Sequence, residues 1–293
     1  MYQVTHRTIY RYNDPVSTGN HQACLKPRDL PYQKVRNFHL NVLPEPSLVT
    51  ERYDYFANTV HSFSIQDQHS ELVVETRSEV EVDRSQSESA GDALPWEDAV
   101  GQLSEERSTF ALDAYQFRFE SPRIRLRRKF AEYALASFTA RRPLRQALLD
   151  LTARIHRDFK FQANATHVGT TVEEVFEKRR GVCQDFAHLE IACLRSMRIA
   201  ARYVSGYLRT DPPPGMSRLV GADASHAWVS AYCPGDGWLD LDPTNNIVAG
   251  NDHITIAWGR DYGDVSPLRG SIMGGGVQSL QVAVDVEMIS QAA

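Results

Sequence analysis

Residues 181–188 read Gly181-Val182-Cys183-Gln184-Asp185-Phe186-Ala187-His188, which places a cysteine at the start of a predicted helix. The helix is predicted because apolar residues continue at helical spacing through Phe186, Leu189, Cys193 and Met197. At a helix start, unpaired backbone N–H groups and the positive end of the helix dipole can stabilise a thiolate. The same N–H groups can donate to an oxyanion. Cys183 is therefore a candidate nucleophile, and a buried structural cysteine is the alternative.

A thiolate enzyme also needs a base, together with a group that orients the base. Among the ten histidines, His226 is best placed because it opens a predicted strand, residues 226–232, in which side-chain direction is fixed. His188 is closer to Cys183 in sequence. Five residues along a helix, however, rotate a side chain by about 140° and lift it by about 7.5 Å. We therefore expect His188 to have a packing role away from the thiol.

Asp242 closes the next predicted strand, residues 237–242. The turn Pro234-Gly235-Asp236-Gly237 joins the two strands into a hairpin, which brings His226 and Asp242 side by side at one end. An aspartate that accepts from one imidazole nitrogen leaves the other nitrogen for the thiol. From spacing alone, a turn residue before proline explains Asp242 equally well, and Asp240 on the same strand face could take its place.

Four blocks together resemble the core of the transglutaminase-like superfamily. They are residues 181–188, Ala201-Arg202-Tyr203-Val204-Ser205-Gly206-Tyr207, Ala224-Ser225-His226-Ala227-Trp228-Val229 and Gly237-Trp238-Leu239-Asp240-Leu241-Asp242-Pro243-Thr244-Asn245. The order Cys, His, Asp matches that family. Its motif centres on the aspartate before Pro-Thr, which favours Asp242 over Asp240. The resemblance implies a papain-like core with Cys183 as nucleophile, His226 as base and Asp242 as the orienting group.

The first part of the chain has a different pattern. Residues 1–83 contain short alternating runs separated by turn residues such as Asn13-Asp14-Pro15, which predicts a β sandwich. Asp54-Tyr55-Phe56-Ala57-Asn58 resembles a segment of the β domain that precedes the core in bacterial transglutaminase-like proteins. Those proteins usually have glycine where Ala57 stands.

From Ser121 onward the apolar period becomes helical, and predicted strands follow the helices. Helices before strands predict an α+β fold with helices packed on an antiparallel sheet. We therefore expect residues 1–83 to form an amino-terminal β sandwich, residues 84–120 a linker and connecting segment, and residues 121–293 the catalytic domain.

Composition excludes some classes of function. The 293 residues carry a net charge of −5, which gives no electrostatic reason to bind nucleic acid or an anionic membrane. No apolar run approaches the ~18 residues that span a bilayer. The four cysteines are too few and too scattered for a disulfide framework. The first residues form strand-like sequence and not a signal peptide. We expect a cytoplasmic protein.

These observations predict a cysteine-dependent enzyme that attacks an amide bond of a peptide or protein and forms a thioester on Cys183. Hydrolysis of the peptidase or amidase type is favoured, and transfer between a protein glutamine and an amine is the alternative. Gln184 and Trp228 are candidates for oxyanion or substrate contacts. An exposed surface amide explains Gln184 equally well, and a core position is the favoured interpretation of Trp228. No cofactor and no metal are expected.

Two functions outside this class remain to be compared with it. A zinc site could use Cys183, His188, His226 and Cys233, but their spacing does not match the usual paired ligands. A catalytically inactive binding module could keep the same fold, but the presence of Cys183, His226 and Asp242 together argues against it.

Overall fold

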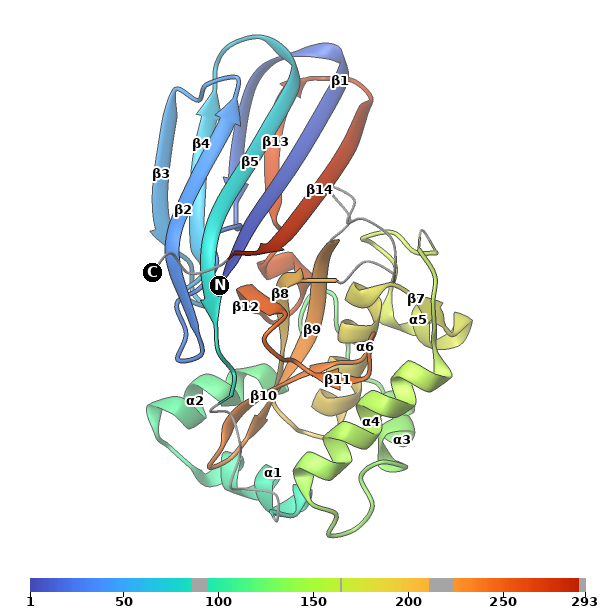
Figure 1. The fold of residues 1–293 in the computed structure, drawn as a ribbon. Coiled ribbons are helices and arrows are strands. Elements are labelled where there is room, and N and C mark those ends of the chain that lie inside the picture. The colour runs from blue at the N-terminus through green and yellow to red at the C-terminus, as the bar shows by residue number, and fades with distance from the viewer. Residues whose placement is uncertain (86–93, 164, 211–223, 290–293) are drawn as a thin grey trace, which may run out of the picture.

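The computed structural model describes residues 1–85, 94–163, 165–210 and 224–289. A β sheet forms one end of the molecule and a mixed helical and β core forms the other (Figure 1). Within the described residues, no helix is both long and apolar enough to cross a membrane.

One seven-stranded sheet contains the amino-terminal strands and two strands from the end of the chain. All the strand pairs in this sheet are antiparallel. Its members are β1 (Tyr2–Ala23), β2 (Gln33–Leu43), β3 (Leu48–Tyr53), β4 (Thr59–Ile65), β5 (His69–Val82), β13 (Leu268–Gly274) and β14 (Gln278–Met288).

Strand β1 determines the shape of this sheet. Its first half pairs with β5 and β14, and its last residues pair with β4 and β13. The pairing register with β5 shifts between Arg11 and Val16, where the sequence predicted a turn at Asn13-Asp14-Pro15. A bulge bends a strand without ending it. The strands therefore form one sheet bent into a half-barrel, and not the clear β sandwich that the sequence predicted.

The last strands return to the amino-terminal sheet. The sequence assigned residues 121–293 to the catalytic domain, yet β13 and β14 pair with β1. Their connection, Gly274 to Gly276, has positive φ angles throughout. A Cβ atom on Gly276 would lie 2.3 Å from Asn13 Oδ1, so this turn requires glycine to fit against the bulge of β1. The apolar interior of the bent sheet contains Tyr12, Val16, Phe63, Ile65, Leu72 and Val74.

The core contains six α-helices and a five-stranded antiparallel sheet within the described residues, which confirms the predicted α+β class. The helices are α1 (Trp96–Glu105), α2 (Thr109–Tyr115), α3 (Arg128–Leu135), α4 (Leu144–Asp158), α5 (Val172–Lys178) and α6 (Cys183–Ser196). The sheet has the order β11 (Ile247–Val248), β10 (Gly237–Asp242), β9 (Ala224–Cys233), β8 (Ala201–Leu208), β12 (His253–Gly259). Short elements complete the core: η1 (Gln116–Arg118), β6 (Lys160–Phe161), β7 (Arg180–Gly181) and η2 (Tyr262–Asp264).

Helices α1 and α2 lie in the range that the sequence assigned to a linker and connecting segment. Most of the polar stretch from Ser85 to about Gly91 lies outside the described residues.

Helix α6 lies at the centre of the core. Nearly all of its side chains after the first turn are buried, including Phe186, Leu189 and Leu194, and it packs against β9. A helix that is buried around most of its circumference is held in a fixed position. Its first residue, Cys183, is thereby fixed relative to the sheet.

Polar contacts join the two ends of the molecule. The Gln33 amide donates to Thr255 O at 2.7 Å and accepts from Thr255 N at 2.8 Å, so it pairs with edge strand β12 as another strand would. The Arg28 guanidinium stacks over the Trp258 ring at 3.5 Å. His6 Nδ1 lies 2.8 Å from the Tyr207 hydroxyl.

Candidate active site

The helix start that carries Cys183 has no side-chain cap. Val182 occupies the cap position with an extended backbone, and its apolar side chain cannot accept from the first N–H groups. The Asp185 carboxylate instead turns back and accepts from Val182 N at 2.8 Å and from the Thr166 hydroxyl at 2.6 Å. Gly181 is required here, because a Cβ atom on it would lie 2.8 Å from Asp185. Residues 181–185 therefore fix the backbone on which the partly exposed Cys183 stands.

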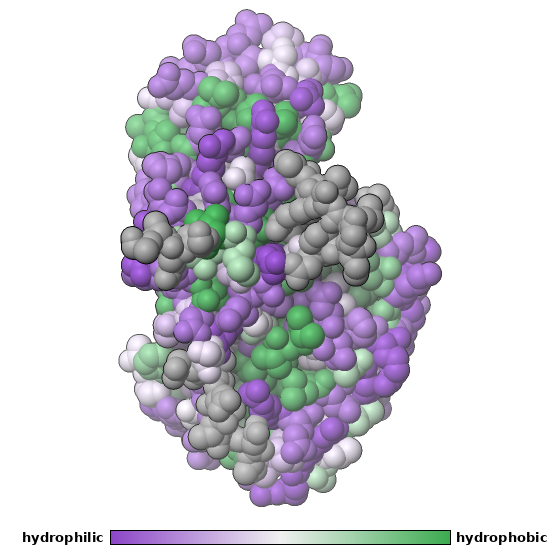
Figure 2. Space-filling model, in the orientation of Figure 1, coloured by the Kyte–Doolittle hydropathy of each residue, from purple (hydrophilic) through white to green (hydrophobic). Residues whose placement is uncertain are grey.

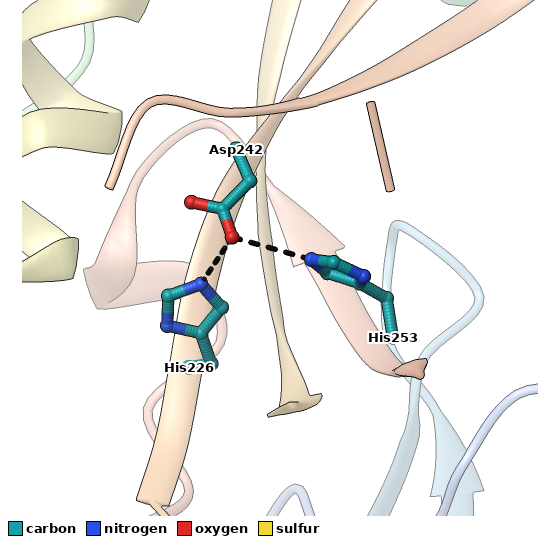
Figure 3. A group of neighbouring side chains, drawn as sticks. All are labelled: His226, Asp242 and His253. Atoms are coloured by element: carbon teal, nitrogen blue, oxygen red, sulfur yellow. Dashed lines mark hydrogen bonds and ion pairs between the residues drawn. The ribbon is translucent and has the colours of Figure 1, made fainter. Parts of the chain in front are cut away.

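His226 and Asp242 meet as the hairpin predicted. The His226 Nε2 atom lies 2.7 Å from Asp242 Oδ2. Strand pairing explains this contact: Leu241 on β10 faces Val229 on β9, so the next residue, Asp242, is a diagonal neighbour of His226. The other imidazole nitrogen of His226 points away from Asp242 (Figure 3).

The Asp242 carboxylate is fully buried and accepts five hydrogen bonds. Its Oδ1 atom accepts from the backbone N–H groups of Thr244 at 2.9 Å and Asn245 at 3.2 Å. Its Oδ2 atom accepts from His226, from the Asn245 amide at 2.7 Å and from His253 at 3.2 Å. Burial alone would raise the pKa of Asp242, but the hydrogen bonds from His226 and His253 hold it well below its ordinary value.

The Cys183 side chain lies close enough to the His226 ring to act on its pKa. Because Nε2 faces Asp242, the nitrogen available to sulfur is Nδ1. Burial alone would lower the pKa of His226. Its hydrogen bond with Asp242 and its interaction with Cys183, together with the negative charges of both partners, raise that pKa to about 10. The structure thus brings together the three residues predicted as a triad, in an arrangement that favours a protonated imidazole.

Two residues near Asp242 were missed by the sequence analysis. His253 opens β12 and is 1% exposed, and Asn245 follows Asp242 in the turn to β11. Figure 3 shows the His226 and His253 rings directed at the same carboxylate oxygen. His253 shares one sequence feature with His226, since each is a histidine near the start of a core strand. That feature could have marked it as a candidate.

This cluster has ligand types that also suit a metal ion. The ligand atoms of His226, Asp242 and His253 lie within 4.8 Å of one another. Both imidazole nitrogens, however, already bond Asp242 Oδ2, and they would have to release it to bind a cation. The zinc set considered from sequence does not converge either. Cys233 stands seven positions beyond His226 on the same strand, about 23 Å away.

The remaining candidates have other surroundings. Trp228 is fully buried and packs edge-on to His253, so a substrate cannot reach it. Gln184 is half-buried beside Cys183 in the first turn of α6, and its role as a donor stays a prediction. Asp240 accepts from Arg84 at 3.0 Å and from Tyr32 at 3.4 Å, so it belongs to the contact between the two ends of the molecule.

His188 has a packing environment. Its Nε2 atom accepts from the Tyr262 backbone N–H at 3.1 Å, and its ring packs on Tyr203 with a centroid distance of 5.0 Å. Burial lowers the pKa of His188 to about 3, so the ring is neutral and can accept.

Comparison with known proteins agrees with this architecture. Residues 2–81 match the family model "Bacterial transglutaminase-like N-terminal region", and residues 132–243 match the model "Transglutaminase-like superfamily". An uncharacterized protein of Mycobacterium tuberculosis is 41% identical over 97% of this chain and 92% of its own length. An uncharacterized protein of Mycobacterium leprae is 30% identical over 98% of this chain and 99% of its own length.

A solved structure shows the same fold. It is named "Putative Cysteine Protease" and comes from Cytophaga hutchinsonii, with a TM-score of 0.77 and 20% identity over 100% of this chain and 91% of that one. A shorter match links this chain to the protein-glutamine gamma-glutamyltransferase of Pseudomonas aeruginosa. The two are 38% identical over a segment that covers 25% of this chain and 11% of that protein. The chain therefore belongs to the transglutaminase-like superfamily, with a bacterial transglutaminase-like amino-terminal region before the core.

Proposed function

We propose that the protein is a thiol enzyme that cleaves an amide bond of a peptide or protein through a thioester on Cys183. The observation that carries the proposal is the chain of contacts from Cys183 to His226 and on to Asp242. A raised pKa of about 10 keeps His226 protonated at neutral pH, and an imidazolium beside the sulfur stabilises a thiolate.

The reaction then follows from these positions. The Cys183 thiolate adds to the carbonyl carbon of the amide, and the negative charge moves to the carbonyl oxygen. Unpaired N–H groups of the first turn of α6, with the Gln184 amide beside them, are the donors we assign to that oxygen. His226 donates its Nδ1 proton to the departing amine as the carbon–nitrogen bond breaks. Asp242 keeps the ring oriented throughout.

The second half of the reaction consumes the thioester. Water, deprotonated by His226, attacks the acyl carbon, the carbon–sulfur bond breaks, and a carboxylic acid leaves. We favour hydrolysis because Cys183 is only partly buried, which lets water reach the acyl group. The relative named protein-glutamine gamma-glutamyltransferase supports the alternative, in which an amine takes the place of water.

A surface feature beside the site suits a peptide. Figure 2 shows an apolar patch on the core in the region of β11. Ile247 and Val248 of that strand are 44% and 38% exposed, and Ile247 pairs with Asp242. We assign this patch to apolar side chains of the substrate. The free thiols fit a reducing compartment, so a cytoplasmic location is part of the proposal.

Mass spectrometry of the products from a peptide library, with and without a primary amine, tests this function. Hydrolysis adds the mass of water across the cleaved bond, whereas transfer to an amine adds the amine in place of ammonia. The Cys183→Ala variant serves as the control for contaminating activity. Turnover of no peptide under either condition would favour a binding module on the same fold.

A further inference from the structure

His253 lies outside the Cys, His and Asp set, yet its ring is fixed at both nitrogens. Nδ1 lies 3.2 Å from the Gly250 backbone nitrogen, and Nε2 lies 3.2 Å from Asp242 Oδ2. A backbone N–H can only donate, so Nδ1 must be the unprotonated nitrogen. The ring proton is therefore on Nε2 and points at the carboxylate. His253 is a neutral donor to Asp242.

His253 also has a defined place in the core sheet. It stands where the chain crosses from β11, which pairs with β10, to β12 at the opposite edge of the sheet. The ring packs edge-on against the buried Trp228 with a centroid distance of 5.2 Å. Trp228 also packs against His226, with a centroid distance of 6.2 Å. One tryptophan therefore supports both histidines.

The Asp242 carboxylate could rotate if fewer donors held it. The two backbone donors on Oδ1 fix one end of the group. His253 and the Asn245 amide approach Oδ2 together with His226. A donor on Oδ2 from a third strand keeps this oxygen at the position from which it orients the His226 ring.

We propose that His253 is a positioning residue for the proposed reaction: by donating to Asp242 it fixes the carboxylate oxygen that orients His226. The inference rests on the proposed function. It assigns His253 no contact with substrate. Cys183 faces His226 from α6, and on the same helix burial and, to a smaller extent, the charge of Asp242 raise the pKa of Glu190 to about 8, so Cys183 and Glu190 are left unchanged in the test.

Two substitutions separate this role from plain packing. In His253→Gln, the side-chain nitrogen can occupy the place of Nε2 and still donate to Asp242. In His253→Asn, the side-chain oxygen can occupy the place of Nδ1 and still accept from Gly250, but the side chain is too short to reach Asp242. If His253 positions Asp242, glutamine rescues turnover and asparagine does not. If His253 only holds the Gly250 turn, the order is reversed.

We base the expected changes in kcat and KM on the effect of replacing residues that hold a functional histidine in position. We expect His253→Asn to lower kcat by roughly 10- to 100-fold with KM within about 2-fold, and His253→Gln to keep most of the wild-type kcat. Melting temperatures of both variants, followed by circular dichroism, identify any loss of kcat that arises from unfolding.

A spectroscopic measurement tests the inference independently of activity. The proton on His226 Nε2, in its hydrogen bond to Asp242, gives a low-field NMR signal that is assigned by its absence in His226→Gln. We expect this signal to persist in His253→Gln and to shift or disappear in folded His253→Asn. An unchanged signal in His253→Asn, or its loss from both variants, would overturn the positioning role. Absence of peptide turnover from the wild type would instead overturn the proposed function and leave the NMR comparison intact.

Discussion

At the scale of single residues, Asp242 shows why the carboxylate of the proposed triad is hard to replace. Each of its two oxygens accepts more than one donor, and none of its surface is exposed. In Asp242→Asn, the new NH2 group must face either two backbone N–H groups or the donors from His226, Asn245 and His253. We expect stability to fall by about 1–3 kcal/mol because buried donors lose their acceptor. We expect turnover to fall by up to about 10⁴-fold.

Urea denaturation and steady-state kinetics measure these two effects. The matched control is Asp236→Asn, which makes the same chemical change in the exposed turn of the same hairpin. Asp242→Asn with wild-type stability and wild-type turnover would show that the five hydrogen bonds do not matter.

The charge state of His226 makes a pH-dependent contribution to stability. Its pKa is about 10 in the folded protein and about 6.5 in the unfolded chain, so the folded state holds the proton more tightly. The contribution is therefore complete below pH ~6.5 and is lost as the pH rises to about 10. We expect the difference in unfolding free energy between the wild type and His226→Gln to shrink over this window. A difference that is constant from pH 6 to 10 would contradict the raised pKa.

At the scale of elements, Cys183 and His188 lie on the same helix, α6, and have separate roles. His188→Ala removes the acceptor of the Tyr262 N–H and leaves space beside Tyr203. We expect stability to fall by about 2–4 kcal/mol, with kcat of the folded protein reduced far less than in His226→Ala. Loss of turnover at unchanged stability would place His188 in the chemistry.

The sequence predicted α6, the β9–β10 hairpin and the meeting of His226 with Asp242, because all three depend on local spacing. The prediction of a turn at Asn13-Asp14-Pro15 was wrong, because a bulge in a long strand favours the same residue types as a turn. Helix α2 was missed because Phe110 and Leu112 are 82% and 52% exposed and so obscure the buried face of a short helix. His253 was missed because its contact with Asp242 depends on how the chain crosses from β11 to β12.

At the scale of the whole molecule, the amino-terminal sheet and the core are joined through Gln33. Gln33 and Thr255 are each 1% exposed, so the backbone groups of Thr255 have no access to solvent. We expect Gln33→Ala to destabilise the protein by about 1–3 kcal/mol, since it leaves a buried donor and a buried acceptor with fewer partners. Denaturation in urea measures the change, and the exposed Gln281→Ala is the matched control. Equal stability of the two variants would contradict a structural role for this contact.

Local sequence patterns cannot predict which distant strands and side chains pair with each other. The alternation in residues 278–288 predicts a strand but cannot say that its partner is β1, more than 260 positions earlier. The same limit applies to Gln33 and Thr255, which are 222 positions apart. The resemblance to a family therefore indicated the class of the core, whereas the return of β13 and β14 required the structure.

The central claim is that Cys183 is a nucleophile activated by His226, and the three other cysteines provide an internal standard for it. Burial raises the pKa of Cys24 and of Cys233 to about 12 and raises that of Cys193 further, so these thiols should react slowly. Cys183 is the partly exposed member of the four. The most direct measurement is the rate of iodoacetamide alkylation at each cysteine from pH 5 to 10, followed by peptide mass spectrometry.

We predict that Cys183 is alkylated at neutral and mildly acidic pH at least ~100-fold faster than the other three cysteines. We predict also that His226→Ala moves its pH profile to higher pH, because the imidazolium partner is lost. Cys183 that reacts only at alkaline pH, with the same profile in wild type and His226→Ala, would contradict the account.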